Sequence, residues 1–112
     1  MAETPISAAI KNGNLEMVKF LVECGADIEH REIQGRTPLY YAGSRCHIDI
    51  TRYLISIGGN VNARTAMGRT ALLKAVWNGQ VELVKVLLEH PDIDINIIDS
   101  SERTPLHMAA WG

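Results

Sequence analysis

The feature that most constrains this chain is a sequence unit that occurs three times in full and a fourth time in part. Copies of one motif start at Thr4, Thr37, Thr70 and Thr104, and successive starts are 33, 33 and 34 residues apart. The last copy, Arg103–Ala110, reads RTPLHMAA and is the best formed. Periods of about 20 to 50 residues indicate a repeat architecture, in which each unit buries its apolar surface against its neighbours.

Each copy opens with a pattern that predicts the start of a helix. A threonine hydroxyl at the N-cap accepts a hydrogen bond from an orphan backbone N–H of the first turn. Proline follows in three of the four copies, at the first helical position, where its missing N–H costs nothing. Gly13 and Gly79 fit the C-terminal cap of this short helix. Cys46 stands in the same column of the second copy, so that turn is expected to be strained or differently built.

A second helix is predicted to begin near Leu15, Ile48 and Val81, because a carboxylate follows each of them and favours the positive end of the helix dipole. An alternating segment comes next and leads to Gly35 or Gly68, which suit a turn with positive φ. Each repeat is therefore expected to be a helical pair followed by a short extended hairpin. The apolar face of the second helix recurs at i, i+3 and i+4 and comprises Met17, Phe20, Leu21; Ile50, Tyr53, Leu54; and Leu83, Val86, Leu87.

Composition narrows the class of protein further. A chain of 112 residues with 46% hydrophobic content can form one globular domain. The net charge of −2 and the lack of a basic run argue against nucleic acid. Apolar stretches fall far short of the roughly 18 to 20 residues that span a bilayer, and no secretory signal opens the chain. Cys24 and Cys46 are expected to be reduced, buried packing thiols, with a disulfide between them as the open alternative.

Taken together, these columns resemble an ankyrin repeat array over Thr4–Gly112. The resemblance implies an all-α repeat solenoid of stacked helix-turn-helix pairs with short β-hairpin loops. The last repeat stops after its first helix, which suggests a fragment of a longer array or protein; the alternative is a three-repeat protein closed by one capping helix. The expected repeats are residues 4–36, 37–69 and 70–103, with a partial fourth at 104–112.

Recognition is a better-motivated role for this chain than catalysis. It contains no G-x-S-x-G elbow, P-loop or H-E-x-x-H motif, and its four histidines lie in different columns, so no catalytic, metal or cofactor site is expected. The family resemblance implies that hairpin tips and exposed residues of the first helices line a concave side where partner proteins bind. Packing of Trp77 against the adjoining hairpin is the structural alternative. These columns give Ile33, Gln34, Arg36, Ser44, Arg45, Met67, Arg69, Trp77, Asn78, Arg103 and Trp111.

Asn62 and Asn96 form a second signal. A leucine lies eight residues before each, and Asn60 or Asp94 lies two before. This is similar to the pattern by which ankyrin asparagines are hydroxylated by a 2-oxoglutarate-dependent asparaginyl hydroxylase. The favoured alternative is structural, with each asparagine bonding to neighbouring hairpin backbone and holding successive repeats in register.

The sequence therefore predicts a non-enzymatic protein–protein interaction scaffold in the cytoplasm or nucleus. Its partner is expected to be a protein of unknown identity, with no nucleic acid and no membrane insertion. We expect a monomer, with end-to-end contacts where the fourth unit stops. The alternative is a regulatory or targeting module of a larger enzyme or channel whose other domains lie outside this chain; intrinsic catalysis is the least favoured reading.

Overall fold

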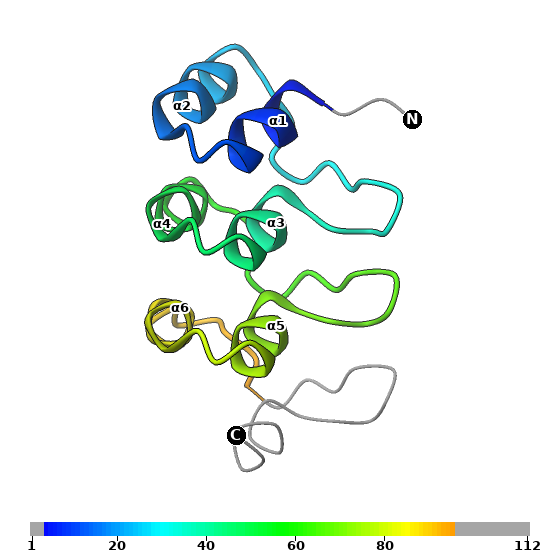
Figure 1. The fold of residues 1–112 in the computed structure, drawn as a ribbon, viewed down its shortest axis with the longest axis vertical. Coiled ribbons are helices and arrows are strands. Elements are labelled where there is room, and N and C mark those ends of the chain that lie inside the picture. Colours follow the sequence, from blue (N-terminus) through cyan, green and yellow to red (C-terminus); the bar gives the residue numbers. More distant parts are fainter. Residues whose placement is uncertain (1–3, 96–112) are drawn as a thin grey trace.

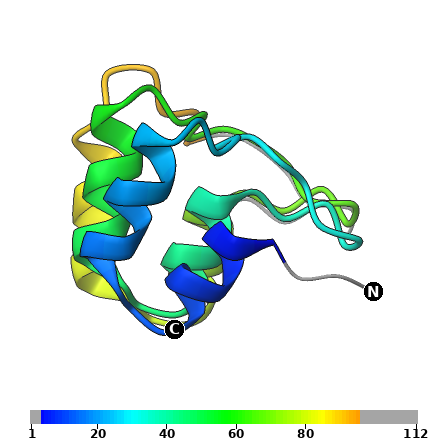
Figure 2. The same cartoon turned by 90° about the horizontal axis from the view of Figure 1, so that it is seen from above.

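The computed structural model describes residues 4–95, which form six helices arranged as three stacked pairs (Figure 1). Seen along the stack, the first helices of the pairs form one column, the second helices form another, and the hairpin loops extend sideways from the first column (Figure 2). We call the two columns the inner and the outer helices. The inner helices are α1 (Pro5–Lys11), α3 (Pro38–Ser44) and α5 (Ala71–Trp77), and the outer helices are α2 (Leu15–Glu23), α4 (Ile48–Ser56) and α6 (Val81–Leu88).

The predicted helix starts are confirmed at all three described copies. Thr4, Thr37 and Thr70 are N-cap residues whose hydroxyls accept hydrogen bonds from backbone N–H groups at distances of 3.2, 3.3 and 3.2 Å. Both threonines that cap α3 and α5 are themselves buried. Because the cap bond satisfies an N–H that would otherwise be unpaired in the core, the threonine column fixes where each repeat begins.

The turn between the two helices of each pair has one conformation in all three repeats. Gly13, Cys46 and Gly79 have φ values of 68°, 62° and 67°. The turn at Cys46 is therefore not differently built, and the expectation of strain applies instead. A side chain in this left-handed region is unfavourable, so Cys46 occupies a position that suits glycine better.

The core lies between the two columns of helices, and in the second and third repeats the predicted apolar face of the outer helices is buried except for Tyr53, which is half-buried. Ile50, Leu54 and Leu87 are completely buried there. In the first repeat this apolar face is largely uncovered, because the side chains of Met17 and Phe20 are 44% and 59% exposed. Within the described residues α2 packs against an outer helix on one side only, so its other side has no neighbour to cover it.

The two hairpins are tight turns, and no strand is assigned within residues 4–95. In the first hairpin the N–H of Glu32 donates to the carbonyl of Arg36 at 3.2 Å, and the N–H of Gly35 donates to the carbonyl of Glu32 at 2.8 Å. Equivalent bonds close the second hairpin. Gly35 and Gly68 have φ values of 77° and 76°, which confirms the prediction of positive φ at these turns.

Both cysteines lie at the surface of the structure. Cys24 and Cys46 are free and exposed, so the expectation of buried packing thiols is wrong. Both residues lie in the turns that end helices, where their side chains do not reach the packed faces. Between residues 4 and 95, every helix is too short or too polar to cross a membrane.

Candidate protein-binding face

The inner helices and the hairpins at residues 30–36 and 63–69 form one continuous surface, which we call the inner face (Figure 2). Arg103, Trp111 and Asn96 lie outside the described residues. The structure places the remaining predicted binding residues on this face or at its edge, where α3 and α5 end. They are Ile33, Gln34, Arg36, Ser44, Arg45, Met67, Arg69, Trp77 and Asn78.

Three large apolar side chains of the inner face are open to solvent. Ile33 is 75% exposed, Met67 is 57% exposed and Trp77 is 52% exposed. Ile33 and Met67 lie in the hairpins, and Trp77 is the last residue of α5. Apolar and aromatic side chains grouped on one face are typical of an interaction surface.

Arginine side chains stack on the aromatic rings of this face. The guanidinium of Arg36 lies 5.4 Å from the centre of the Tyr41 ring, and that of Arg45 lies 5.3 Å from the same ring. One repeat further on, the guanidinium of Arg69 lies 6.0 Å from the ring centre of Trp77. Trp77 thus contacts the base of the adjoining hairpin and still leaves half of its surface free. Such cation–π contacts restrain the arginine side chains without neutralising their charge.

Glu32 anchors the base of the first hairpin. Its carboxylate accepts hydrogen bonds from the backbone N–H groups of Gln34 at 2.8 Å and Arg36 at 3.0 Å, and it pairs with the Arg36 guanidinium at 3.0 Å. The hydrogen bond from Arg36 is the main reason why the pKa of Glu32 is lowered, and the same bond raises the pKa of Arg36. Thr65 takes this place in the second hairpin, where its hydroxyl accepts from the N–H of Arg69 at 3.2 Å.

A groove of about 410 Å³ runs between the first hairpin and the inner helices α1 and α3. Lys11, Arg31 and Tyr41 contribute to its walls, together with Ile33 and Arg36 from the predicted set. Lys11, Arg31 and Tyr41 are not among the predicted residues, which come only from the columns nearest the hairpin tip and the helix end. Tyr41 and Lys74 share a column one residue before the buried Ala42 and Ala75, and that position could have indicated the inner face.

The hairpins are joined to each other through main-chain contacts. The N–H of Ala66 donates to the carbonyl of Gln34 at 3.0 Å, and the Arg31 guanidinium donates to the carbonyls of Gly35 and Arg64. At Gly35 an added Cβ would lie 2.7 Å from the backbone nitrogen of Ala66. The two hairpins therefore act as one support for the side chains that they carry.

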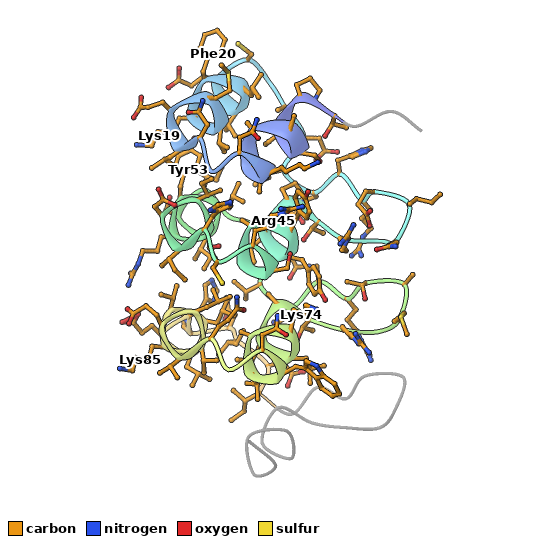
Figure 3. The ribbon with its side chains drawn as sticks, in the orientation of Figure 1. Lys19, Phe20, Arg45, Tyr53, Lys74 and Lys85 are labelled. Atoms are coloured by element: carbon orange, nitrogen blue, oxygen red, sulfur yellow. The ribbon has the colours of Figure 1, made fainter. Side chains whose placement is uncertain are left out.

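Ionised side chains are sorted between the inner face and the rest of the described residues. Figure 3 shows Arg45 and Lys74 on the inner helices and Lys19 and Lys85 on the outer helices. Seven cationic side chains and one carboxylate, Glu32, belong to the inner face; the cations are Lys11, Arg31, Arg36, Arg45, Arg64, Arg69 and Lys74. The outer helices and the loops that leave them carry Lys19, Arg52 and Lys85 but nine carboxylates: Glu16, Glu23, Asp27, Glu29, Asp49, Glu82, Glu89, Asp92 and Asp94.

Asn62 lies between the second and third repeats. Its side-chain N–H donates to the carbonyl of Asp92 at 2.8 Å, and its side-chain oxygen accepts from the N–H of Asp94 at 2.9 Å. In the first repeat the same column is filled by Glu29, whose carboxylate accepts from the N–H of Asn60 at 3.0 Å. Asn62 therefore links two repeats through backbone groups. Hydroxylation of Asn62 or Asn96 stays a prediction.

A stack of helical pairs with hairpins on one side defines a helical repeat protein, and its columns identify the kind of repeat. A family model of ankyrin repeats (3 copies) matches residues 1–65 and 57–112, and the chain belongs to this ankyrin-repeat family. Ankyrin repeats are generally protein–protein interaction modules and are typically non-enzymatic. Among residues 4–95, no group of three His, Cys, Asp or Glu side chains could hold a metal ion.

Two curated proteins share parts of this sequence. The chain is 44% identical over 43 residues to the apicidin F cluster transcription factor apf2 of Gibberella fujikuroi. These residues make up 38% of this chain and 11% of that protein. It is 31% identical over 107 residues to alpha-latrocrustotoxin-Lt1a of Latrodectus tredecimguttatus, which covers 96% of this chain and 5% of that protein. The chain thus spans a small part of the length of both relatives.

Proposed function

We propose that this array is a non-enzymatic scaffold that binds a partner protein on its inner face. The observation that carries the proposal is the half-exposed Trp77 stacked by Arg69, whose hairpin also carries the exposed Met67. Tryptophan and arginine are the residues most often found as binding anchors, and a few such anchors supply most of the affinity of an interface. Their arrangement supports a protein partner.

The support beneath these anchors favours binding. The hairpins are tied together by the Ala66 to Gln34 bond and by Arg31, and the arginine side chains are stacked on rings. Side chains that are already ordered lose less conformational entropy when a partner binds. The array therefore works as a rigid display of side chains, with no movement of its own required.

A cross-linking experiment tests the location of the partner. A photoreactive amino acid replaces either Arg45 on the inner face or Lys85 on α6, and the array is illuminated in extract from its own cells. We expect a partner protein to be captured from the Arg45 position and not from the Lys85 position. Capture from Lys85 alone would refute the inner-face proposal.

An alanine variant tests the anchors themselves. The double variant Trp77→Ala and Arg69→Ala is expected to lower the affinity for the captured partner by about tenfold or more, the usual effect of removing a binding anchor. The free energy of unfolding is expected to fall by no more than about 1 kcal/mol, as for other surface changes. Val81→Ala is the matched control, because Val81 is an exposed apolar residue of an outer helix. Unchanged binding by the double variant would show that these residues are not the anchors.

A second candidate is a regulatory or targeting module within a larger enzyme or channel. The relatives favour a module within a longer polypeptide, since this chain matches only 11% and 5% of their lengths; their names describe a transcription factor and a toxin. One fold can serve unrelated functions, so the remainder of the polypeptide would decide the activity. Cross-linking from Arg45 in the full-length gene product separates the candidates: capture of another segment of the same polypeptide supports the module, and capture of a separate protein supports the scaffold.

The two thiols support a reducing compartment for the proposed scaffold. The free, exposed Cys24 and Cys46 suit the reducing cytoplasm or nucleus, where disulfides are rare. We propose that the array acts there as a monomer on a protein partner, without nucleic acid.

Hydroxylation of Asn62 or Asn96 is a separate proposal. Treatment with the asparaginyl hydroxylase and peptide mapping by mass spectrometry is expected to show the gain of one oxygen atom at either residue. If neither residue gains an oxygen atom, the hydroxylation proposal is refuted.

A further inference from the structure

We infer that the partner segment held on the inner face is an extended acidic one, rich in Asp and Glu with apolar side chains between them. This inference rests on the proposed function of the inner face and adds the chemistry of the partner. Its basis is the sorting of charge, which gives the inner face seven cations and one carboxylate within a chain of net charge −2. Complementary charge steers a partner to such a face and selects among competitors.

Several of these cations have no carboxylate of their own to neutralise them. Within residues 4–95 no ion pair is found for Lys11, Arg45 or Lys74. Arg45 is exposed and its guanidinium lies over the Tyr41 ring. A guanidinium stacked on a ring by its flat face keeps the N–H groups at its edge available to a carboxylate. The face therefore offers hydrogen-bond donors with positive charge that the array itself does not use.

Shape and apolar surface point to an extended peptide. The groove of about 410 Å³ has Lys11 and Arg31 in its walls, with the exposed Ile33 at the hairpin. Further along the face, Lys74 and Arg69 surround the half-exposed Trp77. Both parts of the face thus combine cations with apolar side chains. A segment that alternates acidic and apolar residues satisfies both at once.

A polynucleotide fits this charge pattern less well. Seven of the ten Lys and Arg side chains in residues 4–95 belong to the inner face, whereas the loops that leave the outer helices carry carboxylates such as Asp27, Glu29, Asp92 and Asp94. A phosphate backbone that extends beyond the inner face would meet this negative charge and be repelled. A short acidic peptide can remain within the cationic area.

An unbiased peptide selection tests the inference. The array is used to select from a random peptide library, and enriched peptides are synthesised with a fluorescent label for anisotropy titration. We expect the enriched peptides to contain more Asp and Glu than the starting library. We also expect their affinity to fall as salt is raised, because exposed charge pairs are screened beyond about 10 Å at 0.1 M ionic strength.

Two charge-reversal variants locate the effect. Arg45→Glu with Lys74→Glu changes the inner face, and Arg52→Glu with Lys85→Glu makes the same change of net charge on exposed residues of the outer helices. The inner-face variant is expected to bind the selected peptides about tenfold more weakly, because two attractive ion pairs are lost and the new carboxylates add repulsion. The outer variant is expected to bind within twofold of the wild type. Circular dichroism and thermal melting confirm that both variants are folded.

Five outcomes would overturn the inference, three from the binding experiments and two from cross-linking. Enriched peptides that are no more acidic than the library would refute the chemistry, and an equal loss of affinity in both variants would show that net charge acts instead of the face. Tighter binding of a labelled oligothymidylate than of the selected peptides would assign the face to nucleic acid. Cross-linking from Arg45 to a neutral protein segment would leave the proposed function standing and reject only the acidic partner, whereas capture from Lys85 alone rejects both.

Discussion

Replacing Asn62 with alanine is predicted to loosen the contact between the second and third repeats while leaving the first two together. The side chain of Asn62 is half-buried and makes two hydrogen bonds to backbone groups of the following repeat, at 2.8 and 2.9 Å. Because a neutral hydrogen bond contributes about 1 kcal/mol net, Asn62→Ala is expected to lower the stability of this contact by about 2 kcal/mol.

Native-state hydrogen exchange measures this effect at the right place. The N–H of Asp94 donates to the Asn62 side chain, so its protection is expected to drop in the variant, whereas amides of α1 and α2 keep theirs. In Asn62→Asp, one carboxylate oxygen can still accept from Asp94 while the bond to Asp92 is lost, and the Asp94 amide is expected to keep more protection than in Asn62→Ala. Asn78→Ala is the matched control, since Asn78 is exposed at the end of α5.

Two results would refute this reasoning. Unchanged protection of the Asp94 amide in Asn62→Ala would mean that the side-chain bonds do not hold the repeats in register. An equal loss of protection in α1 and at Asp94 would mean that the array opens as a single unit, because a contact between neighbouring repeats is expected to act locally in a one-dimensional stack.

Other consequences of the structure can be measured on the same protein. Leu54→Ala, at a fully buried side chain, is expected to lower the free energy of unfolding in urea by about 2–5 kcal/mol, and Phe20→Ala, at a side chain that is 59% exposed, by less than about 1 kcal/mol; similar losses would contradict the burial. Gly35→Ala is expected to lower the melting temperature more than Gly58→Ala, because both residues have positive φ but only at Gly35 would the Cβ meet backbone of the next hairpin; an equal loss would show that this approach is not tight. Since the pKa of Glu32 is lowered in the fold, its ionised form adds stability that is present above the unfolded-state pKa and is lost as pH falls through the lowered value. Urea unfolding of Glu32→Gln at a series of pH values is expected to show a weaker loss on the acid side, and a curve parallel to that of the wild type would contradict the assignment.

Most of the fold could be predicted from columns that repeat every 33 or 34 residues. The threonine caps and the positive φ at Gly35 and Gly68 follow from local chemistry, which is identical in each copy. The burial of individual side chains could not be predicted in this way, because it depends on which neighbours cover them. Phe20 has the same pattern around it as Tyr53, yet Phe20 is exposed, because a periodic pattern indicates which side of a helix is apolar and not whether a neighbour covers it. The exposure of Cys46 has a similar cause, since its column forms the turn and not the packed face.

The candidate site was predictable in position and not in charge. Hairpin and helix-end columns identified residues such as Arg36, Arg69 and Trp77, which the fold brings to one face. The full cationic character of that face was not visible, because Lys11, Arg31 and Lys74 come from different columns and are separated by oppositely charged residues in the sequence. A repeat fold places residues about one period apart side by side, so a basic surface needs no basic run.

We predict that the arrangement of charge, and not its total, selects the partner. Arg45→Glu combined with Glu82→Arg moves one cation from the inner face to the exposed first turn of α6 and leaves the net charge of the chain unchanged. We expect this exchange to lower the affinity for acidic peptides in anisotropy titrations, because the inner face loses a hydrogen-bond donor and gains a carboxylate. The long-range electrostatic field of the molecule keeps its overall sign. Glu82→Arg with Arg52→Glu is the control, since it exchanges the same charges within the outer helices. If the exchange across faces and the exchange within the outer helices bind equally well, the sorting of charge between the faces has no part in recognition.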